Sequence, residues 1–175
     1  VQSFIVFDHG EGEAQAAKIV ARNHQYLGVN RVIQRLTSTD AAVRAEVDAG
    51  KLGVYWHTQG SGKSYSMVFL VNKVRRTLGG QYSFLVVTDR LDLDAQIAGT
   101  FANCGVVTDA KAARIPDSAS VQDRLKLDLR VQFALVHKFK HRPPKDSLSE
   151  KPNLIVLSDE AHRTQYGRLA MNMRM

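Results

Sequence analysis

Apolar residues along this chain gather into short, nearly continuous runs, and stretches with helical spacing lie between them. The runs predict buried strands at residues 52–56, 84–88, 105–108, 131–136 and 154–158. Three of them (LGVYW, FLVVT and LIVLS) show no polar alternation, which is typical of strands covered on both faces. Helical spacing predicts helices at residues 63–78, 91–102 and 119–129. This alternation favours an α/β fold with a mainly parallel sheet and helices on both faces.

The first fifty residues follow a different pattern. Residues 3–7 predict a short extended segment that leads into a polar loop. Apolar residues at roughly helical spacing then predict a helix over 14–36, with a break near Gly28. A second helix is expected over 39–49, with a cap at Ser38 or Thr39.

These patterns suggest three parts: an extended lead-in over residues 1–13, a helical segment over 14–50 and a sheet domain over 51–175. The chain begins with a valine and ends soon after its last informative motif. We therefore expect it to be a piece of a longer protein, with the lead-in arriving from an upstream domain.

Composition limits the classes of protein to consider. The 175 residues carry a net charge of +7 and give an isoelectric point near 9.7, which suits a polyanionic partner. The single cysteine excludes an internal disulfide and fits a reducing compartment. A signal peptide and an apolar run long enough to cross a bilayer are both absent from the sequence, so we expect a cytoplasmic protein with no membrane partner.

The most informative stretch is a glycine-rich turn between the first predicted strand and the helix after it. Gly60 and Gly62 would let the backbone approach an oxygen closely, while Lys63 and Ser64 open the helix. The strict G-x-x-x-x-G-K-[ST] pattern fails at His57, which we interpret as a packing or hydrogen-bonding residue. An ordinary strand-to-helix turn is the alternative, but the attached Lys-Ser pair favours a phosphate-binding loop in which Ser64 also binds Mg²⁺.

A pair of carboxylates follows the last predicted strand. Asp159 can hold Mg²⁺ through water, and Glu160 can orient the water that attacks a γ-phosphate. An acid-rich helix N-terminus is the alternative. Ligands bind at the carboxyl ends of parallel strands, so the pair and the phosphate loop together favour a nucleotide site.

The motifs also resemble those of a known family. HTQGSGKS, VVTDRLDLDAQ and LSDEAHRTQYG resemble motifs I, Ia and II of superfamily 2 helicase-type ATPases, including a DEAH box. The residues within and around these motifs are similar to those of the motor of the R subunit of type I restriction–modification enzymes. The segment KIVARNHQY resembles that family's adenine-reading element. The resemblance implies the first RecA-like P-loop NTPase domain of such a motor.

Site residues follow from this resemblance. It implies that ATP is bound by Gln25, Gly60, Ser61, Gly62, Lys63 and Ser64. It implies that Mg²⁺ is held by Ser64 and, through water, by Asp159, and that catalysis uses Lys63, Asp159 and Glu160. Residues near the DNA backbone would be Thr88, Asp89 and Arg90, although a local ion pair capping the next helix explains Asp89 and Arg90 equally well.

The resemblance also implies an activity. The complete protein would couple ATP hydrolysis to translocation of double-stranded DNA before cleavage, in complex with methyltransferase and specificity subunits. The nuclease domain and a second motor domain with its arginine finger would lie outside this chain, so the isolated piece should bind nucleotide weakly and hardly hydrolyse it. The alternatives are another superfamily 2 translocase or helicase, or a nucleotide-dependent switch.

Overall fold

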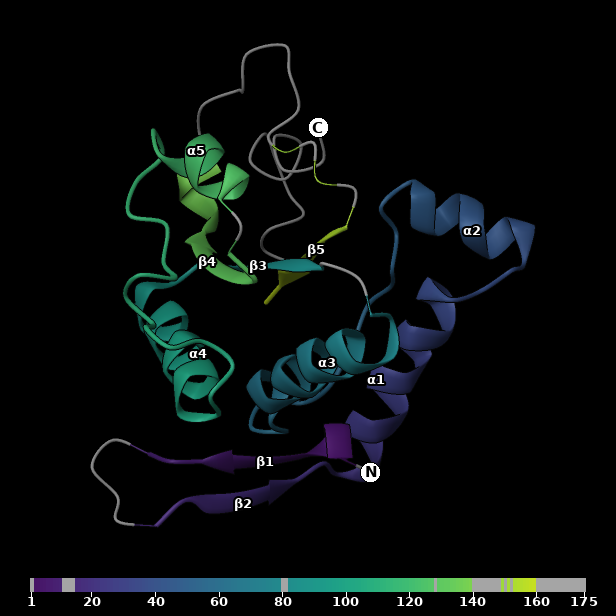
Figure 1. The fold of residues 1–175 in the computed structure, drawn as a ribbon, viewed down its shortest axis with the longest axis horizontal. Helices are drawn as coiled ribbons and strands as arrows, with labels where there is room; N and C mark the ends of the chain where they lie inside the picture. The colour runs from purple at the N-terminus through teal and green to yellow at the C-terminus, as the bar shows by residue number, and fades with distance from the viewer. Residues whose placement is uncertain are drawn as a thin grey trace. The chain divides into compact units, whose positions relative to one another are not determined.

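The computed structural model describes residues 2–10, 15–79, 82–127, 129–139, 149, 151 and 153–159 (Figure 1). These residues form two compact units, Val1–Gly79 and Gly80–Met175. The helix that follows the glycine-rich loop therefore clusters with the N-terminal elements, whereas the sequence assigned it to the sheet domain. The expected domain boundary near residue 50 stays a prediction. In the described part of the chain, no helix is long and apolar enough to span a bilayer.

The first unit combines a β-hairpin with three helices. Its elements are η1 (Gln2–Phe4), β1 (Ile5–Asp8), β2 (Ala17–Val20), α1 (Asn23–Leu36), α2 (Ala41–Asp48) and α3 (Lys63–Thr77). β1 and β2 pair antiparallel, with Val6 opposite Ile19. The helix predicted from residue 14 is therefore wrong over its first part, because residues 17–20 form a ladder with β1 and the helix begins only at Asn23.

Helix α1 packs against α3 through one face. Its buried residues, Gln25, Val29 and Ile33, are spaced four apart, as a helix with one covered face requires. The break expected near Gly28 does not occur, since α1 runs through that glycine without interruption.

Helix α2 has no buried residue. Its cap is Asp40, not Ser38 or Thr39, and the Asp40 carboxylate accepts hydrogen bonds from the N–H groups of Ala42 and Val43 at 2.9 and 3.0 Å.

The second unit is built on a parallel sheet. Its elements are β3 (Ser83–Thr88), α4 (Leu91–Asn103), α5 (Val121–Lys126), β4 (Val131–Leu135), η2 (Val136–Phe139) and β5 (Leu154–Ser158). The strand order is β4-β3-β5, and both pairings are parallel, with Val86 opposite Phe133 on one side and Leu157 on the other. The predicted α/β class and parallel sheet are confirmed.

Helices cover both faces of this sheet. On one face, Phe101 of α4 meets Phe133 of β4 edge to face, with ring centroids 5.3 Å apart. On the other face, Leu85, Val87 and Ala134 form a buried cluster with Val121 and Leu125 of α5. Figure 1 shows α4 and α5 on opposite sides of β3 and β4.

Two predicted strands are not strands in the structure. Residues 52–56 form no ladder; Tyr55 is partly buried, and Val54 and Trp56 lie on the surface. Residues 105–108 instead end α4: Gly105 has a φ of +68°, and the N–H groups of Gly105 and Val106 bond to the carbonyls of Ala102 and Phe101 at 2.8 and 2.9 Å. That pair of bonds is a Schellman cap, so the apolar run there belongs to a helix terminus.

Candidate nucleotide-binding site

The glycine-rich loop of the first unit has the backbone that its sequence predicts. Gly60 and Gly62 have φ values of +76° and +82°, where side chains other than hydrogen are strained. Gly62 is the N-cap of the 15-residue helix α3, whose first N–H groups therefore point toward the loop. A Cβ added at Gly60 would meet nothing within 4 Å. Open space beside Gly60 and a helix N-terminus together suit an anionic ligand.

Lys63 and the serines of this loop lie next to that space. The Lys63 ammonium donates hydrogen bonds to the carbonyls of His57 and Thr58, at 3.2 and 3.4 Å, so it reaches back across the loop. Ser64 is half-buried in the first turn of α3. The Ser61 hydroxyl is buried and has no hydrogen-bond partner among the described residues. These are the polar groups that could contact a phosphate or its metal ion.

Gln25, the predicted adenine-reading residue, contacts the loop itself. Its side chain is buried, with its residue only 4% exposed. Nε2 donates to the Gly62 carbonyl at 2.9 Å, and Oε1 accepts from the Arg22 N–H at 2.8 Å. Each end of the amide still has one free hydrogen-bonding position. Its contact with adenine stays a prediction, but its contact with the loop is an observation.

The structure adds contacts of Tyr55, which the motifs do not include, and of His24, which lies in KIVARNHQY but has no role assigned by the resemblance. The Tyr55 ring packs against Gly28, where an added Cβ would lie only 2.0 Å from Tyr55 Cε2. His24 Nε2 lies 3.1 Å from the Ser61 carbonyl. Gly28 was the available signal, since a glycine inside an amphipathic helix often marks a close packing neighbour.

His57 has the packing role expected for it. Its ring lies 4.4 Å from the ring of Tyr55 and 4.6 Å from that of His24, between centroids. The pKa of His57 is lowered, first by loss of water contact and then by the positive charges of His24 and Lys63. A neutral imidazole is therefore favoured at this position.

In the second unit, Asp159 directly follows β5. Its N–H donates to the Val87 carbonyl at 2.9 Å, so it lies at the carboxyl end of β5 beside β3, and it is half-buried. The sequence predicts this strand and places Asp159 directly after its last residue, as the structure has it. Glu160 and His162 lie outside the described residues. The joint use of Lys63, Asp159 and Glu160 stays a prediction.

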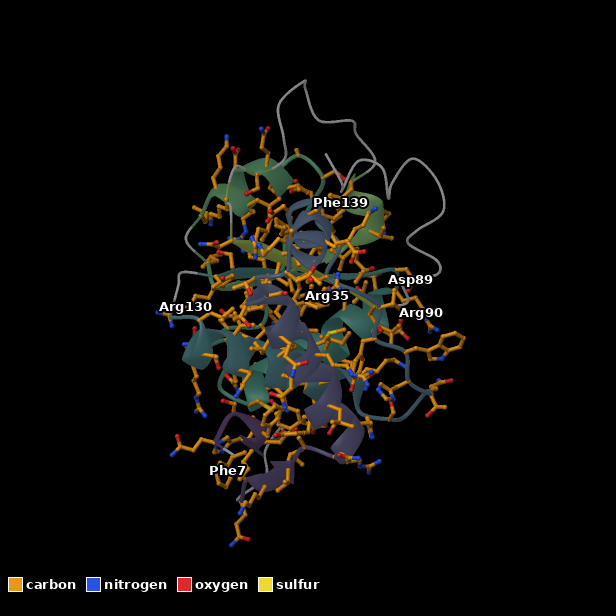
Figure 2. The ribbon with its side chains drawn as sticks, turned by 90° about the vertical axis from the view of Figure 1, so that its right-hand side faces the viewer. Phe7, Arg35, Asp89, Arg90, Arg130 and Phe139 are labelled. Carbon is orange, nitrogen blue, oxygen red and sulfur yellow. The ribbon has the colours of Figure 1, made fainter. Side chains whose placement is uncertain are left out.

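The three residues expected near DNA lie at the carboxyl end of β3: Thr88 is its last residue, and Asp89 and Arg90 follow it (Figure 2). Thr88 is fully buried, which rules out a direct side-chain contact with DNA in this conformation. Asp89 is half-buried. Arg90 is exposed and forms an ion pair with Asp92 in the first turn of α4, at 2.7 Å. The local ion pair therefore exists, with Asp92 as the partner of Arg90, and a DNA contact by Arg90 or Asp89 stays a prediction.

Comparison with known proteins agrees with these features. A family model described as SWI2/SNF2 ATPase matches residues 24–175. The endonuclease subunit of the type I restriction enzyme HindI from Haemophilus influenzae is 34% identical over 95% of the chain. The putative type I restriction enzyme MjaIXP endonuclease subunit from Methanocaldococcus jannaschii is 32% identical over 99% of the chain. The chain spans only 16% of the length of each of these two relatives. The predicted likeness to such subunits is confirmed.

Proposed function

The chain belongs to the SWI2/SNF2 ATPase family, and we propose that it is the first motor domain of a type I restriction enzyme R subunit. In the complete protein, ATP hydrolysis would drive translocation of double-stranded DNA before a separate domain cuts it. Two relatives above 30% identity over nearly the whole chain, both named as type I restriction endonuclease subunits, support this assignment.

The observation that carries the proposal is the loop at the start of α3. Lys63 would leave the carbonyls of His57 and Thr58 and bind the β- and γ-phosphates of ATP. The first N–H groups of α3, at Ser64 and Tyr65, would bind phosphate oxygens. Gly60 has no Cβ, and the space where one would lie is open, whereas the space beside Gly62 is occupied by Gln25 Nε2, 2.9 Å from the position of an added Cβ.

The residues present fit a magnesium ion. Mg²⁺ prefers hard oxygen ligands and retains several waters, and the Ser64 hydroxyl and the half-buried Asp159 carboxylate are such ligands. The ion would neutralise charge on the phosphate oxygens. Glu160 would accept a proton from the attacking water, as its place in the DEAH sequence implies. Gln25 would bind the adenine edge with the remaining capacity of its amide.

The proposal also includes partners. Arg90 and Asp89 would lie near the DNA backbone, and the basic charge of the chain suits that contact. Methyltransferase and specificity subunits would complete the assembly. The competing assignments are another superfamily 2 translocase or helicase, and a nucleotide-dependent switch.

The experiment is to measure DNA-stimulated ATPase activity and ATP affinity of the full-length gene product with Lys63→Ala. We expect both to fall by at least tenfold, whereas Lys111→Ala, which removes an exposed lysine between α4 and α5, should leave both unchanged. Unchanged ATPase activity in Lys63→Ala would refute the phosphate-loop assignment. ATP binding without DNA-stimulated hydrolysis would favour the switch, and DNA-stimulated hydrolysis without cleavage by the reconstituted complex would favour another translocase.

A further inference from the structure

Side chains, not a strand ladder, hold the segment that leads into the phosphate loop. Residues 52–58 belong to no described strand. Among the described residues, one backbone hydrogen bond lies at the start of the loop, and it joins the N–H of Ser61 to the carbonyl of Thr58 at 3.3 Å. Val54 and Trp56 are 83% and 87% exposed. Tyr55 between them packs inward, and His57 is also half-buried. The position of the loop in the first unit therefore depends on side-chain contacts, including those of Tyr55.

Tyr55 contacts both helices of the first unit that flank the loop. Its ring packs where Gly28 leaves α1 without a side chain. Its hydroxyl lies 3.2 Å from Ser66 Oγ on α3 and 3.4 Å from the His24 carbonyl on α1. Burial raises the pKa of the Tyr55 hydroxyl, against the opposing hydrogen bond with Ser66, so the group keeps its proton and remains a donor at neutral pH.

Ser66 extends this contact to the residue before Lys63. Its hydroxyl lies 3.2 Å from the Gly62 carbonyl and donates to it. Since each hydroxyl has a single proton, Ser66 can donate to the Gly62 carbonyl only while Tyr55 donates to Ser66, and Tyr55 then gives up the longer contact with the His24 carbonyl. The Gly62 carbonyl also accepts from Gln25 Nε2 at 2.9 Å and from the Ser66 N–H at 3.1 Å, so Tyr55, Ser66 and Gln25 all contribute to holding the left-handed residue at the start of α3.

We propose that Tyr55 is a positioning residue for nucleotide binding: through Ser66, its hydroxyl holds Gly62 in the conformation that presents Lys63 and the first N–H groups of α3 to phosphate. The inference rests on the proposed function of the loop. The Tyr55 hydroxyl itself touches no substrate. Its loss should therefore weaken nucleotide binding while leaving the chemical step nearly unchanged.

Tyr55→Phe tests this, because it keeps the ring against Gly28 and removes only the hydroxyl. In the full-length gene product, we expect the Kd of a fluorescent ATP analogue and the KM for ATP to rise about 2- to 10-fold, the effect of losing one hydrogen bond. The kcat should change less than twofold. Ser66→Ala should have the same effect, and the double variant should be no weaker than either single variant, because both act through one chain of contacts.

Thr37→Ala is the matched control. Thr37 follows α1, and its hydroxyl donates to the Ile33 carbonyl at 3.0 Å, four residues back as in Ser66 but outside the Tyr55–Ser66–Gly62 chain. It should lower the melting temperature without raising the Kd. An unchanged Kd in Tyr55→Phe, or fully additive effects of Tyr55→Phe and Ser66→Ala, would overturn the positioning role. If Lys63→Ala still abolished ATP binding in that case, the proposed function would stand without the positioning role of Tyr55. If Lys63→Ala bound ATP normally, the proposed function itself would fail.

Discussion

Removing Arg114 should destabilise the second unit by breaking a buried ion pair. Asp94, in the first turn of α4, has a side chain only 2% exposed, and its Oδ2 lies 2.5 Å from Nε of Arg114, whose side chain is 31% exposed. Arg114 belongs to a segment bonded to β4: the Ile115 N–H donates to the Phe133 carbonyl at 2.8 Å, and the Phe133 N–H donates to the Ala113 carbonyl at 2.9 Å. The pair thus connects α4 with the segment that extends the sheet beyond β4.

The expected loss follows from the burial of the two partners. At an effective dielectric constant of about 20, opposite charges at this distance attract by about 7 kcal/mol, but desolvation of Asp94 offsets most of that gain. Arg114→Met leaves the carboxylate buried without compensation, which costs about 3–5 kcal/mol in fully buried pairs. Asp94 Oδ1 has no hydrogen-bond partner among the described residues. Water can enter where the arginine was, because that side chain is one-third exposed, so we expect a loss of about 2–3 kcal/mol.

Urea unfolding followed by far-UV circular dichroism measures this loss globally, and hydrogen exchange measures it locally. A loss of about 2–3 kcal/mol should speed exchange of the Ile115 and Phe133 amides by about 30- to 160-fold, if these amides exchange through opening of the unit. Arg90→Met is the control: it breaks the ion pair with Asp92, whose side chains are 58% and 64% exposed, and should cost less than about 1 kcal/mol.

Replacing both partners distinguishes a lost charge from lost packing. Arg114→Met combined with Asp94→Leu removes the uncompensated carboxylate and should recover most of the stability. The reasoning is wrong if Arg114→Met costs no more than Arg90→Met, or if the double variant is as unstable as Arg114→Met alone.

Three further results are expected. Gly28→Ala gains about 1 kcal/mol of helix propensity but overpacks against Tyr55 at a cost of about 1–3 kcal/mol, so thermal unfolding should show a net loss of stability. In a background that carries Tyr55→Ala, the same substitution should no longer destabilise the protein. The depressed pKa of His57 means that the unfolded chain binds this proton more readily than the folded chain, so the contribution of His57 to stability should fall as pH drops below about 6.5. A triphosphate bound beside His57 would favour its protonated form, so the ATP affinity should increase over the same pH range relative to His57→Gln. ATP turnover by the isolated chain should stay at least about 10³-fold below that of the full-length gene product, because the resemblance implies an arginine finger on a second motor domain, and brisk turnover by the isolated chain would contradict this.

Sequence patterns predicted the second unit best. β3, β4 and β5 lie within one residue of the predicted strands, and α4 ends one residue beyond its predicted end. The reason is physical: strands covered by helices on both faces must be apolar without interruption, and such runs are readable in a single sequence. The run at residues 105–108 failed because its apolar residues serve a helix terminus, and apolar character does not specify a backbone partner.

The N-terminal elements were predicted less well because the residues of a segment do not specify which other segment it pairs with. Residues 17–20 are a strand only because β1 lies opposite them, and the same apolar residues fit a helical spacing when read alone. Helix α1 was placed correctly from Asn23 onward, since Gln25, Val29 and Ile33 repeat at the period that buries one face.

The segment before the phosphate loop shows the difference between conformation and pairing. LGVYW is as continuously apolar as the three confirmed strands, but only Val54, Tyr55 and Trp56 alternate in burial, and Gly53 before them has a φ of +134°. What it lacks in the structure is a ladder, so the side chain of Tyr55 takes on the positioning that neighbouring strands would otherwise share. The motif around Lys63 predicts which groups meet a phosphate. The motif contains no information about Gly28, which determines where the Tyr55 ring packs. The loop depends on Gly28 through Tyr55, and this dependence follows from the packing of Tyr55 against α1, not from the motif.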